Sequence, residues 1–203
     1  MIPIRPPYLL RIFYNELIWR FSVSEKKIYL TFDDGPIPEI TPWVLSVLEK
    51  YQIKATFFCI GDNVKKHPEV YQEILTKGHA VGNHTFNHIK GWNFSTEAYI
   101  ENTKECAALV NSNLFRPPYG RIKKSQIKAL LPNYKIIMWD VLSQDYDKLI
   151  SKEKVYRNVI NGARNGSIIV FHDSLKAAER LKYALPKSIE YLLKRGFVFD
   201  SIS

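Results

Sequence analysis

The sequence contains few sulfur-bearing residues, with two cysteines and two methionines among 203 residues. Cys59 lies inside the apolar run Ala55–Ile60, and Cys106 lies in an expected helix, so the two do not form a C-x-x-C pair. A thiolate metal site or a disulfide framework is therefore not expected. Both cysteines are interpreted as small buried hydrophobic residues, which suits a reducing compartment or one indifferent to redox.

The sequence also lacks a long apolar run. The most apolar N-terminal stretch, residues 8–20, is interrupted by Arg11, Asn15 and Glu16, so it is too short and too polar to span a bilayer. It has neither the apolar centre nor the cleavage site of a signal peptide. The localisation expected from the sequence is cytoplasmic, with peripheral membrane contact or export by an unrecognised route as the alternatives.

Residues 1–27 are expected to form an N-terminal extension that precedes the main domain. The favoured interpretation is an amphipathic helix that packs on that domain. The alternative is an interfacial anchor that binds a membrane with help from a basic surface.

The charge is predominantly positive, with a net charge of +9 and a pI near 9.4. Such a balance suits an anionic polymer, a membrane surface or nucleic acid. The Lys and Arg residues are scattered among acidic residues, however, and no nucleic-acid-binding motif is present. A nucleic-acid partner is therefore not expected, and the charge does not indicate an oligomeric state.

Strand-like and helix-like segments alternate with short connections, and there is no internal repeat or linker. The expected strands span residues 28–33, 55–60, 79–82, 134–139, 167–171 and 197–199, and the expected helices span 38–50, 63–76, 95–111, 125–131, 151–163 and 175–194. This alternation predicts an α/β fold with a parallel sheet. Because polar residues follow several different strands and no glycine-rich phosphate turn is present, a β/α barrel is favoured over an open doubly wound sheet.

The first expected strand ends in Asp33-Asp34-Gly35-Pro36. This sequence is typical of an ordinary turn, because Asp and Gly tolerate turn conformations and Pro fixes its own φ. Two adjacent carboxylates also repel each other and resist burial unless a cation or hydrogen-bond donors compensate. A metal ion would satisfy both side chains.

A second motif, His84-x-x-x-His88, supplies two imidazoles at a spacing that places both on one face of a helical turn. One carboxylate and two histidines with open positions are typical of a hydrolytic zinc site. Zinc is the expected metal, although nitrogen and oxygen ligands also accept cobalt, nickel or manganese. His67 and His79 lie outside the motifs and receive no role.

Four motifs in this order resemble those of the polysaccharide deacetylase family, the NodB-like carbohydrate esterases of family 4. The motifs are Thr31-Phe-Asp-Asp-Gly35, His84-Thr-Phe-Asn-His88, Arg116-Pro-Pro-Tyr119 and Ile169-Val-Phe-His172-Asp173. The resemblance runs from residue 28 to the C-terminus. It implies a single deacetylase domain at 28–203, folded as a distorted seven-stranded β/α barrel with its site at the carboxyl edge of the strands.

The resemblance also implies a role for each motif residue. Asp34, His84 and His88 would bind the metal, and Asp33 would be the general base. The residues alone do not determine which aspartate does which. Arg116 would orient Asp33 and keep it ionised, and the loop at Tyr119 would present a backbone N–H to the developing oxyanion.

His172 would protonate the leaving nitrogen, and a neighbouring carboxylate would make it a better-populated acid. Asp145 is the expected partner of His172, with Asp140 in reserve. Asp173 is interpreted instead as an N-cap of the last helix.

The sequence departs from the family pattern after residue 140, where relatives usually show Asp-x-x-Asp-Trp. Leu142 stands where an acid is common, and Tyr146 replaces the tryptophan. These changes put the substrate preference in doubt more than the reaction. Five aromatic residues on or near the motif loops are either core residues or sugar-stacking residues: Trp92, Phe94, Tyr119, Trp139 and Tyr146.

The expected function is metal-dependent hydrolysis of N-acetyl groups on N-acetylglucosamine units, in peptidoglycan or chitin-like oligomers. The expected partner is therefore a carbohydrate. An alternative is an amidase that acts on a small amide, ureide or formamido sugar with the same site. A glycan-binding module without turnover is disfavoured, because every proposed catalytic position holds a competent residue.

Overall fold

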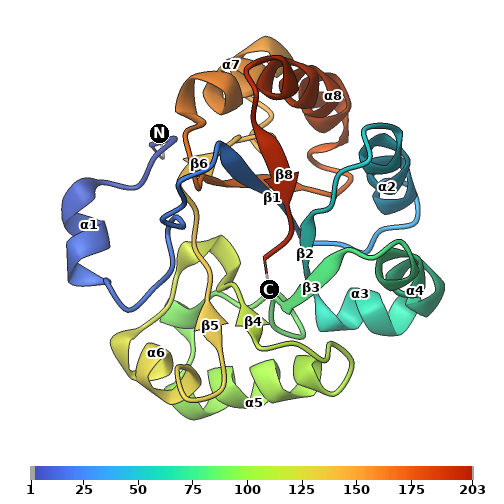
Figure 1. The fold of residues 1–203 in the computed structure, drawn as a ribbon. Helices are drawn as coiled ribbons and strands as arrows, with labels where there is room; N and C mark the ends of the chain where they lie inside the picture. Colours follow the sequence, from blue (N-terminus) through green and yellow to red (C-terminus); the bar gives the residue numbers. More distant parts are fainter. Residues whose placement is uncertain (1–2, 203) are drawn as a thin grey trace.

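The structure is a computed structural model that describes residues 3–202. Its centre is a curled parallel sheet in the order β5-β4-β3-β2-β1-β7-β6, with β8 paired to β1 (Figure 1). The strands are β1 Lys27–Asp33, β2 Thr56–Cys59, β3 Ala80–Asn83, β4 Leu114–Phe115, β5 Lys135–Ile136, β6 Val141–Leu142, β7 Ile168–His172 and β8 Val198–Asp200. The seven strands of the path and the helices outside them confirm the predicted distorted β/α barrel.

Strand β1 is the centre of the sheet, because it pairs in parallel with β2, β7 and β8. Its apolar side chains Ile28, Leu30 and Phe32 are fully buried. A continuous apolar run is what a strand covered on both faces requires. The strand that carries the two aspartates is therefore held rigidly.

Helices cover the outside of the sheet (Figure 1). They are α2 Thr41–Lys50, α3 Gly61–Lys66, α4 Pro68–Thr76, α5 Thr96–Ala107, α6 Lys124–Leu130, α7 Lys152–Gly162 and α8 Ala178–Lys194, with single 3-10 turns η1 Gly91–Asn93 and η2 Pro118–Gly120. Ser95 caps α5 by accepting a hydrogen bond from Ala98 N, as predicted.

The single helix predicted over residues 63–76 is wrong, because the chain forms α3 and α4 there. Pro68 lacks a backbone N–H, and the residue before a proline is driven out of the helical region. His67 accordingly adopts φ −132° and ψ 57°. The proline starts the second helix at its first position, where a missing donor costs nothing.

Two of the two-residue strands, β4 and β6, were not predicted, since two residues are too few to show a period. The strand predicted over 134–139 is regular only at Lys135–Ile136. Beyond it, Met138 N donates to Ile18 O at 2.7 Å, so this part of the chain pairs with the N-terminal extension.

The extension lies between β5 and β6, the two ends of the sheet path. Ile18 forms a parallel bridge with Ile137, and Arg20 forms an antiparallel bridge with Ser167. Further towards the N-terminus, Leu142 N of β6 donates to the backbone oxygen of Ile4 at 2.8 Å. The extension thus bridges the gap that the sheet leaves open.

A short helix, α1 Tyr8–Phe13, forms within the extension, but none of its side chains is buried. The buried apolar contacts of the extension come instead from Leu17 and Trp19, which follow the helix. In residues 3–202, no helix combines the length and apolar character needed to cross a membrane.

Candidate active site

The register of the sheet brings the motif residues to one edge. Asp33 at the end of β1 lies opposite His172 at the end of β7. Across β2 and β3, Cys59 lies opposite Asn83, and Asn83 lies opposite Phe115. The residues that follow these strand ends, among them Asp34, His84 and Arg116, therefore emerge at the same carboxyl edge.

Asp34, His84 and His88 form a cluster whose donor atoms all lie within 4.8 Å of one another. Asp34 Oδ1 is 3.2 Å from His88 Nε2 and 3.8 Å from His84 Nε2. Donors on a tetrahedral zinc ion, with bonds of about 2.0–2.2 Å, lie about 3.4 Å apart. The spacing of the three side chains therefore fits a metal ion of this size.

The protonation of His84 supports the same fit. Its Nδ1 lies 2.7 Å from the backbone oxygen of Arg116, which can only accept, so Nδ1 carries the proton and Nε2 presents its lone pair to Asp34. Burial lowers the pKa of His84 to about 4, so the ring is neutral near pH 7. A neutral imidazole is the form that binds a metal.

The helical turn predicted for residues 84–88 does not form. The segment is an irregular loop in which Thr85 and His88 adopt left-handed φ values of 62° and 54°. Asp34 is also left-handed, with φ 83°. The two imidazoles therefore converge because the loop doubles back, and not because they share a helix face.

Two asparagines hold this loop, and the sequence motifs did not indicate them. Asn83 Oδ1 accepts from Thr85 N at 2.9 Å, and Asn102 Oδ1 on α5 accepts from Phe86 N at 2.9 Å. Asn83 is fully buried, and its Nδ2 donates to Thr103 O at 2.9 Å. The local signal that could have identified Asn83 is its place directly before the first histidine.

Asp33 is paired with Arg116. Arg116 Nη1 donates to Asp33 Oδ1 at 2.7 Å, while its Nη2 and Nε donate to the backbone oxygens of Met138 and Ile137 at 2.9 and 3.2 Å. The guanidinium is fully buried. Burial by itself would raise the pKa of Asp33, but the adjacent Arg116 cation outweighs it and holds the pKa of Asp33 below its ordinary value. Asp33 is therefore an ionised, oriented carboxylate.

His172 is paired with Asp145, the partner preferred from the sequence. His172 Nδ1 lies 2.7 Å from Asp145 Oδ1, and the backbone N of His172 donates to Asp145 Oδ2 at 2.8 Å. Burial would lower the pKa of His172, but the Asp145 carboxylate, with smaller effects of Asp34 and Asp33, raises it to about 9. The imidazolium is thus the dominant form at neutral pH.

The reserve candidate, Asp140, does not contact His172. Its carboxylate accepts two hydrogen bonds from Arg164, at 2.9 and 2.7 Å, and one from Ser167 Oγ at 2.8 Å. Arg5 and Arg11 of the extension lie 3.4 and 3.5 Å from the same side chain. Asp140 therefore links the extension to the barrel.

Asp173 is not an N-cap, so that prediction is wrong: α8 begins only at Ala178, and no side chain caps it. Asp173 is buried, and it accepts from Gly35 N at 3.0 Å and from Thr41 Oγ1 at 2.6 Å. A Cβ on Gly35 would overlap the Asp173 carboxylate, so only glycine fits there. Asp173 thus fixes the turn that carries Asp34.

Two tyrosines line the site. Tyr119 is 60% exposed and lies with its ring 4.6 Å from that of His88. Tyr146 meets the His172 ring edge-on at 4.9 Å. Leu142 is buried in β6 and does not present a polar group to the site.

The remaining residues singled out in the sequence lie elsewhere. Trp92 and Phe94 are exposed, whereas Trp139 packs against Gly120. His79 is a core residue that accepts from Ala55 N, and His67 lies near Glu69. Cys59 and Cys106 are free and buried, as predicted.

The family model described as polysaccharide deacetylase matches residues 21–132. A peptidoglycan-N-acetylglucosamine deacetylase of Bacillus cereus is 34% identical over 192 residues, which cover 91% of this chain and 90% of the relative. A chitooligosaccharide deacetylase of Azorhizobium caulinodans is 32% identical over 162 residues, covering 76% and 77% of the two chains. The crystal structure of the Bc1960 peptidoglycan N-acetylglucosamine deacetylase is similar with a TM-score of 0.86 at 30% identity, covering 97% of this chain and 95% of that one.

Proposed function

This chain belongs to the polysaccharide deacetylase family, and from that premise we propose that it removes N-acetyl groups from N-acetylglucosamine units of peptidoglycan. The substrate class follows the relatives named peptidoglycan-N-acetylglucosamine deacetylases. One observation carries the proposal. An ionised Asp33 and a protonated His172 end adjacent strands at the carboxyl edge of the sheet, beside three side chains that could bind a metal ion.

A divalent metal ion is part of the proposal, with Asp34, His84 and His88 as its protein ligands. Such an ion would polarise an amide carbonyl and lower the pKa of a water molecule. Zinc suits two neutral imidazoles and one carboxylate best, and cobalt, nickel or manganese would also accept this donor set.

Asp33 would take the proton from the attacking water. A base must be ionised and fixed in direction, and the buried Arg116 supplies both conditions. Its neighbour Asp34 would be a poor base, because a metal-bound carboxylate has less affinity for a proton.

His172 would give a proton to the nitrogen as the C–N bond breaks, so that acetate and an amine leave. Its Nδ1 is occupied by Asp145, so Nε2 is the atom that delivers the proton. With a pKa of about 9, this acid is loaded at neutral pH.

The loop at Tyr119 would stabilise the negative charge on the former carbonyl oxygen. Gly120 N donates to Pro117 O at 3.0 Å, so the N–H of Tyr119 is the amide that this loop can offer. The exposed Tyr119 ring and the Tyr146 ring would flank the acetylated sugar.

The test is release of the acyl group from three substrates: acetate from peptidoglycan and from N-acetylglucosamine oligomers, and formate from a small formamido sugar. Each is incubated with protein as purified, after chelation, and after zinc or cobalt is restored. The proposal predicts metal-dependent acetate release from the polymers. Release of formate alone would move the substrate to the small-amide class, and polymer deacetylation by fully chelated protein would refute the metal site.

A further inference from the structure

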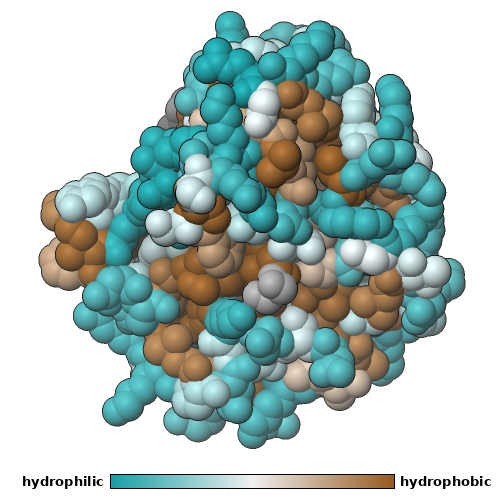
Figure 2. Space-filling view, in the orientation of Figure 1, coloured by the Kyte–Doolittle hydropathy of each residue, from teal (hydrophilic) through white to brown (hydrophobic). Residues whose placement is uncertain are grey.

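Helix α1 exposes a group of apolar side chains. Five of its six side chains are apolar, and all five are exposed: Tyr8 76%, Leu9 65%, Leu10 40%, Ile12 50% and Phe13 68%. Figure 2 shows hydrophobic surface, coloured brown, at the left edge, where Figure 1 places α1 apart from the barrel. Contiguous exposed apolar surface of this kind marks an interaction site.

A cluster of arginines lies directly beside the helix. Besides burial, which lowers the pKa of Arg5 most, the charges of Arg164, Arg11 and Arg20 are close enough to lower it. Within the described residues, the carboxylate that forms ion pairs in this cluster is Asp140, which pairs with Arg5, Arg11 and Arg164. Four guanidinium groups against one carboxylate leave a positive surplus. Arg5 and Arg164 also keep 39% and 40% of their side chains exposed, so the surplus faces solvent.

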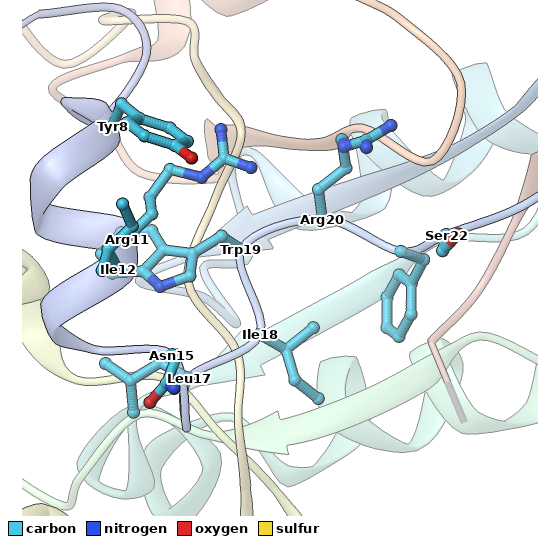
Figure 3. A pocket seen from close by; sticks show the side chains of 10 residues that line it. Tyr8, Arg11, Ile12, Asn15, Leu17, Ile18, Trp19, Arg20 and Ser22 are labelled. Carbon is cyan, nitrogen blue, oxygen red and sulfur yellow. The ribbon is translucent and has the colours of Figure 1, made fainter.

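An open hollow of about 660 Å³ joins the two features. Its lining includes Tyr8, Arg11 and Ile12 of α1, with the Trp19 ring beside them and Arg20 further from the helix (Figure 3). A neighbouring hollow adds Lys124 and Lys128 with Glu16, which is again a net positive set. The region therefore combines apolar side chains that project outward with cations at their base.

We infer that α1 and the arginine cluster bind the surface of a membrane that contains anionic phospholipid. The apolar side chains would enter the boundary between headgroups and acyl chains, about 5–10 Å deep, as the apolar face of an interfacial helix does. The arginines would contact lipid phosphates, for which the guanidinium fork is suited.

A second copy of this chain is a less suitable occupant. A stable protein interface uses about 20–30 residues on each side, whereas α1 offers six and only part of each is exposed. Nor would a neutral protein groove make use of the positive charge that remains at the base of the helix once Asp140 is paired. The inference does not depend on the proposed substrate.

The test is co-sedimentation of the full chain with phosphatidylcholine vesicles, with and without about one third phosphatidylglycerol. Wild-type protein is expected to bind the anionic vesicles, and high salt is expected to weaken binding. The double variant Leu9→Ser/Phe13→Ser should bind at least about tenfold more weakly. The matched control Leu149→Ser removes an apolar side chain that is 95% exposed elsewhere, and it should bind like wild type.

A folding control and three possible contrary results complete the test. Melting temperature and acetate release of the double variant should equal those of wild type, so that weaker binding is not unfolding. Equal vesicle binding by wild type and the double variant would overturn the inference. So would a wild-type dimer that the double variant dissociates while neither binds vesicles. Complete displacement from vesicles by inorganic phosphate would also overturn it, because the site would then recognise the free anion.

Discussion

Two buried carboxylates in this protein differ in the kind of basic side chain that they contact. Asp145 and Asp140 are both fully buried, but Asp145 contacts the imidazole of His172, whereas Asp140 contacts the guanidinium groups of Arg164, Arg5 and Arg11. A histidine can change its protonation near neutral pH, and an arginine cannot. The first carboxylate therefore raises the pKa of His172, the acid of the proposed function, and the second holds two parts of the chain together. The partner determines the role, and burial alone does not.

The largest effect is expected where a carboxylate has a single buried guanidinium partner. Arg116→Ala leaves Asp33 buried without its cation and should lower the free energy of unfolding by about 3–5 kcal/mol. The pKa of Asp33 should rise, because burial is no longer opposed, so the acid limb of kcat/KM should move to higher pH. Urea unfolding and a pH–rate profile measure both effects.

A control for this variant is Arg121→Ala on the same loop. The Arg121 guanidinium lies 4.4 Å from the Trp92 ring and contacts no carboxylate in the described residues. Its removal should cost about 0.5–1 kcal/mol. If the two variants lose the same stability and keep the same acid limb, Asp33 does not depend on Arg116.

The second prediction concerns Asp145→Asn. Without the carboxylate, the pKa of His172 should fall from about 9 towards its ordinary 6.5. Because the proposed function uses His172 in its protonated form, activity should be lost as pH rises through this pKa, and the alkaline limb should move to lower pH. In wild type the raised pKa also stabilises the fold, fully below about pH 6.5 and no longer above about 9. If the alkaline limb of the kcat profile stays in place in Asp145→Asn, Asp145 does not set the pKa of the catalytic acid.

The third prediction uses Asp140→Asn as the counterpart. The alkaline limb should stay in place, since Asp140 does not contact His172. The free energy of unfolding should fall by about 1–3 kcal/mol, discounted because the arginine partners are 24–40% exposed. Thermal unfolding beside the pH–rate profile separates the two roles, and a shifted limb would show that the two carboxylates are not distinct.

The smallest effect is expected for Asp173→Asn. Burial, with the nearby Asp34 charge, raises the pKa of Asp173 to about 8, so the carboxyl is largely neutral at pH 7, and an amide can replace both of its hydrogen bonds. The loss should stay below about 1 kcal/mol, whereas Asp173→Ala should cost about 1–3 kcal/mol and weaken zinc binding by displacing the Asp34 turn. Calorimetric zinc titration compares the two variants. Equal zinc affinity in all three proteins would make Asp173 a packing residue only.

Much of the fold and of the site was predictable, because short segments of sequence indicated them. The apolar run before Asp33 required a buried strand. The two aspartates, the two histidines and His172 lie at or just after the ends of parallel strands, which meet at one edge of the sheet. Local patterns could not predict how the histidine loop doubles back, because its shape depends on hydrogen bonds from Asn83 and from Asn102 on a later helix.

Other features depended on partners distant in sequence. Asp173 resembled a cap because it precedes a helix, but its partners are Gly35 and Thr41 at the other end of the chain. Strands of two residues, such as β4, cannot show a period and become visible only through pairing. The packing of the extension likewise depended on which tertiary contacts Leu17 and Trp19 find.

The central claim is that adjacent aspartates divide the work, with Asp34 as metal ligand and Asp33 as base. The direct measurement compares bound zinc and acetate release in Asp33→Asn and Asp34→Asn beside wild type. We predict that Asp33→Asn keeps its zinc and loses about 10²–10⁴-fold in kcat, while Asp34→Asn loses zinc and regains part of its activity in excess metal. Loss of zinc from Asp33→Asn, or full zinc occupancy in Asp34→Asn, would contradict this division.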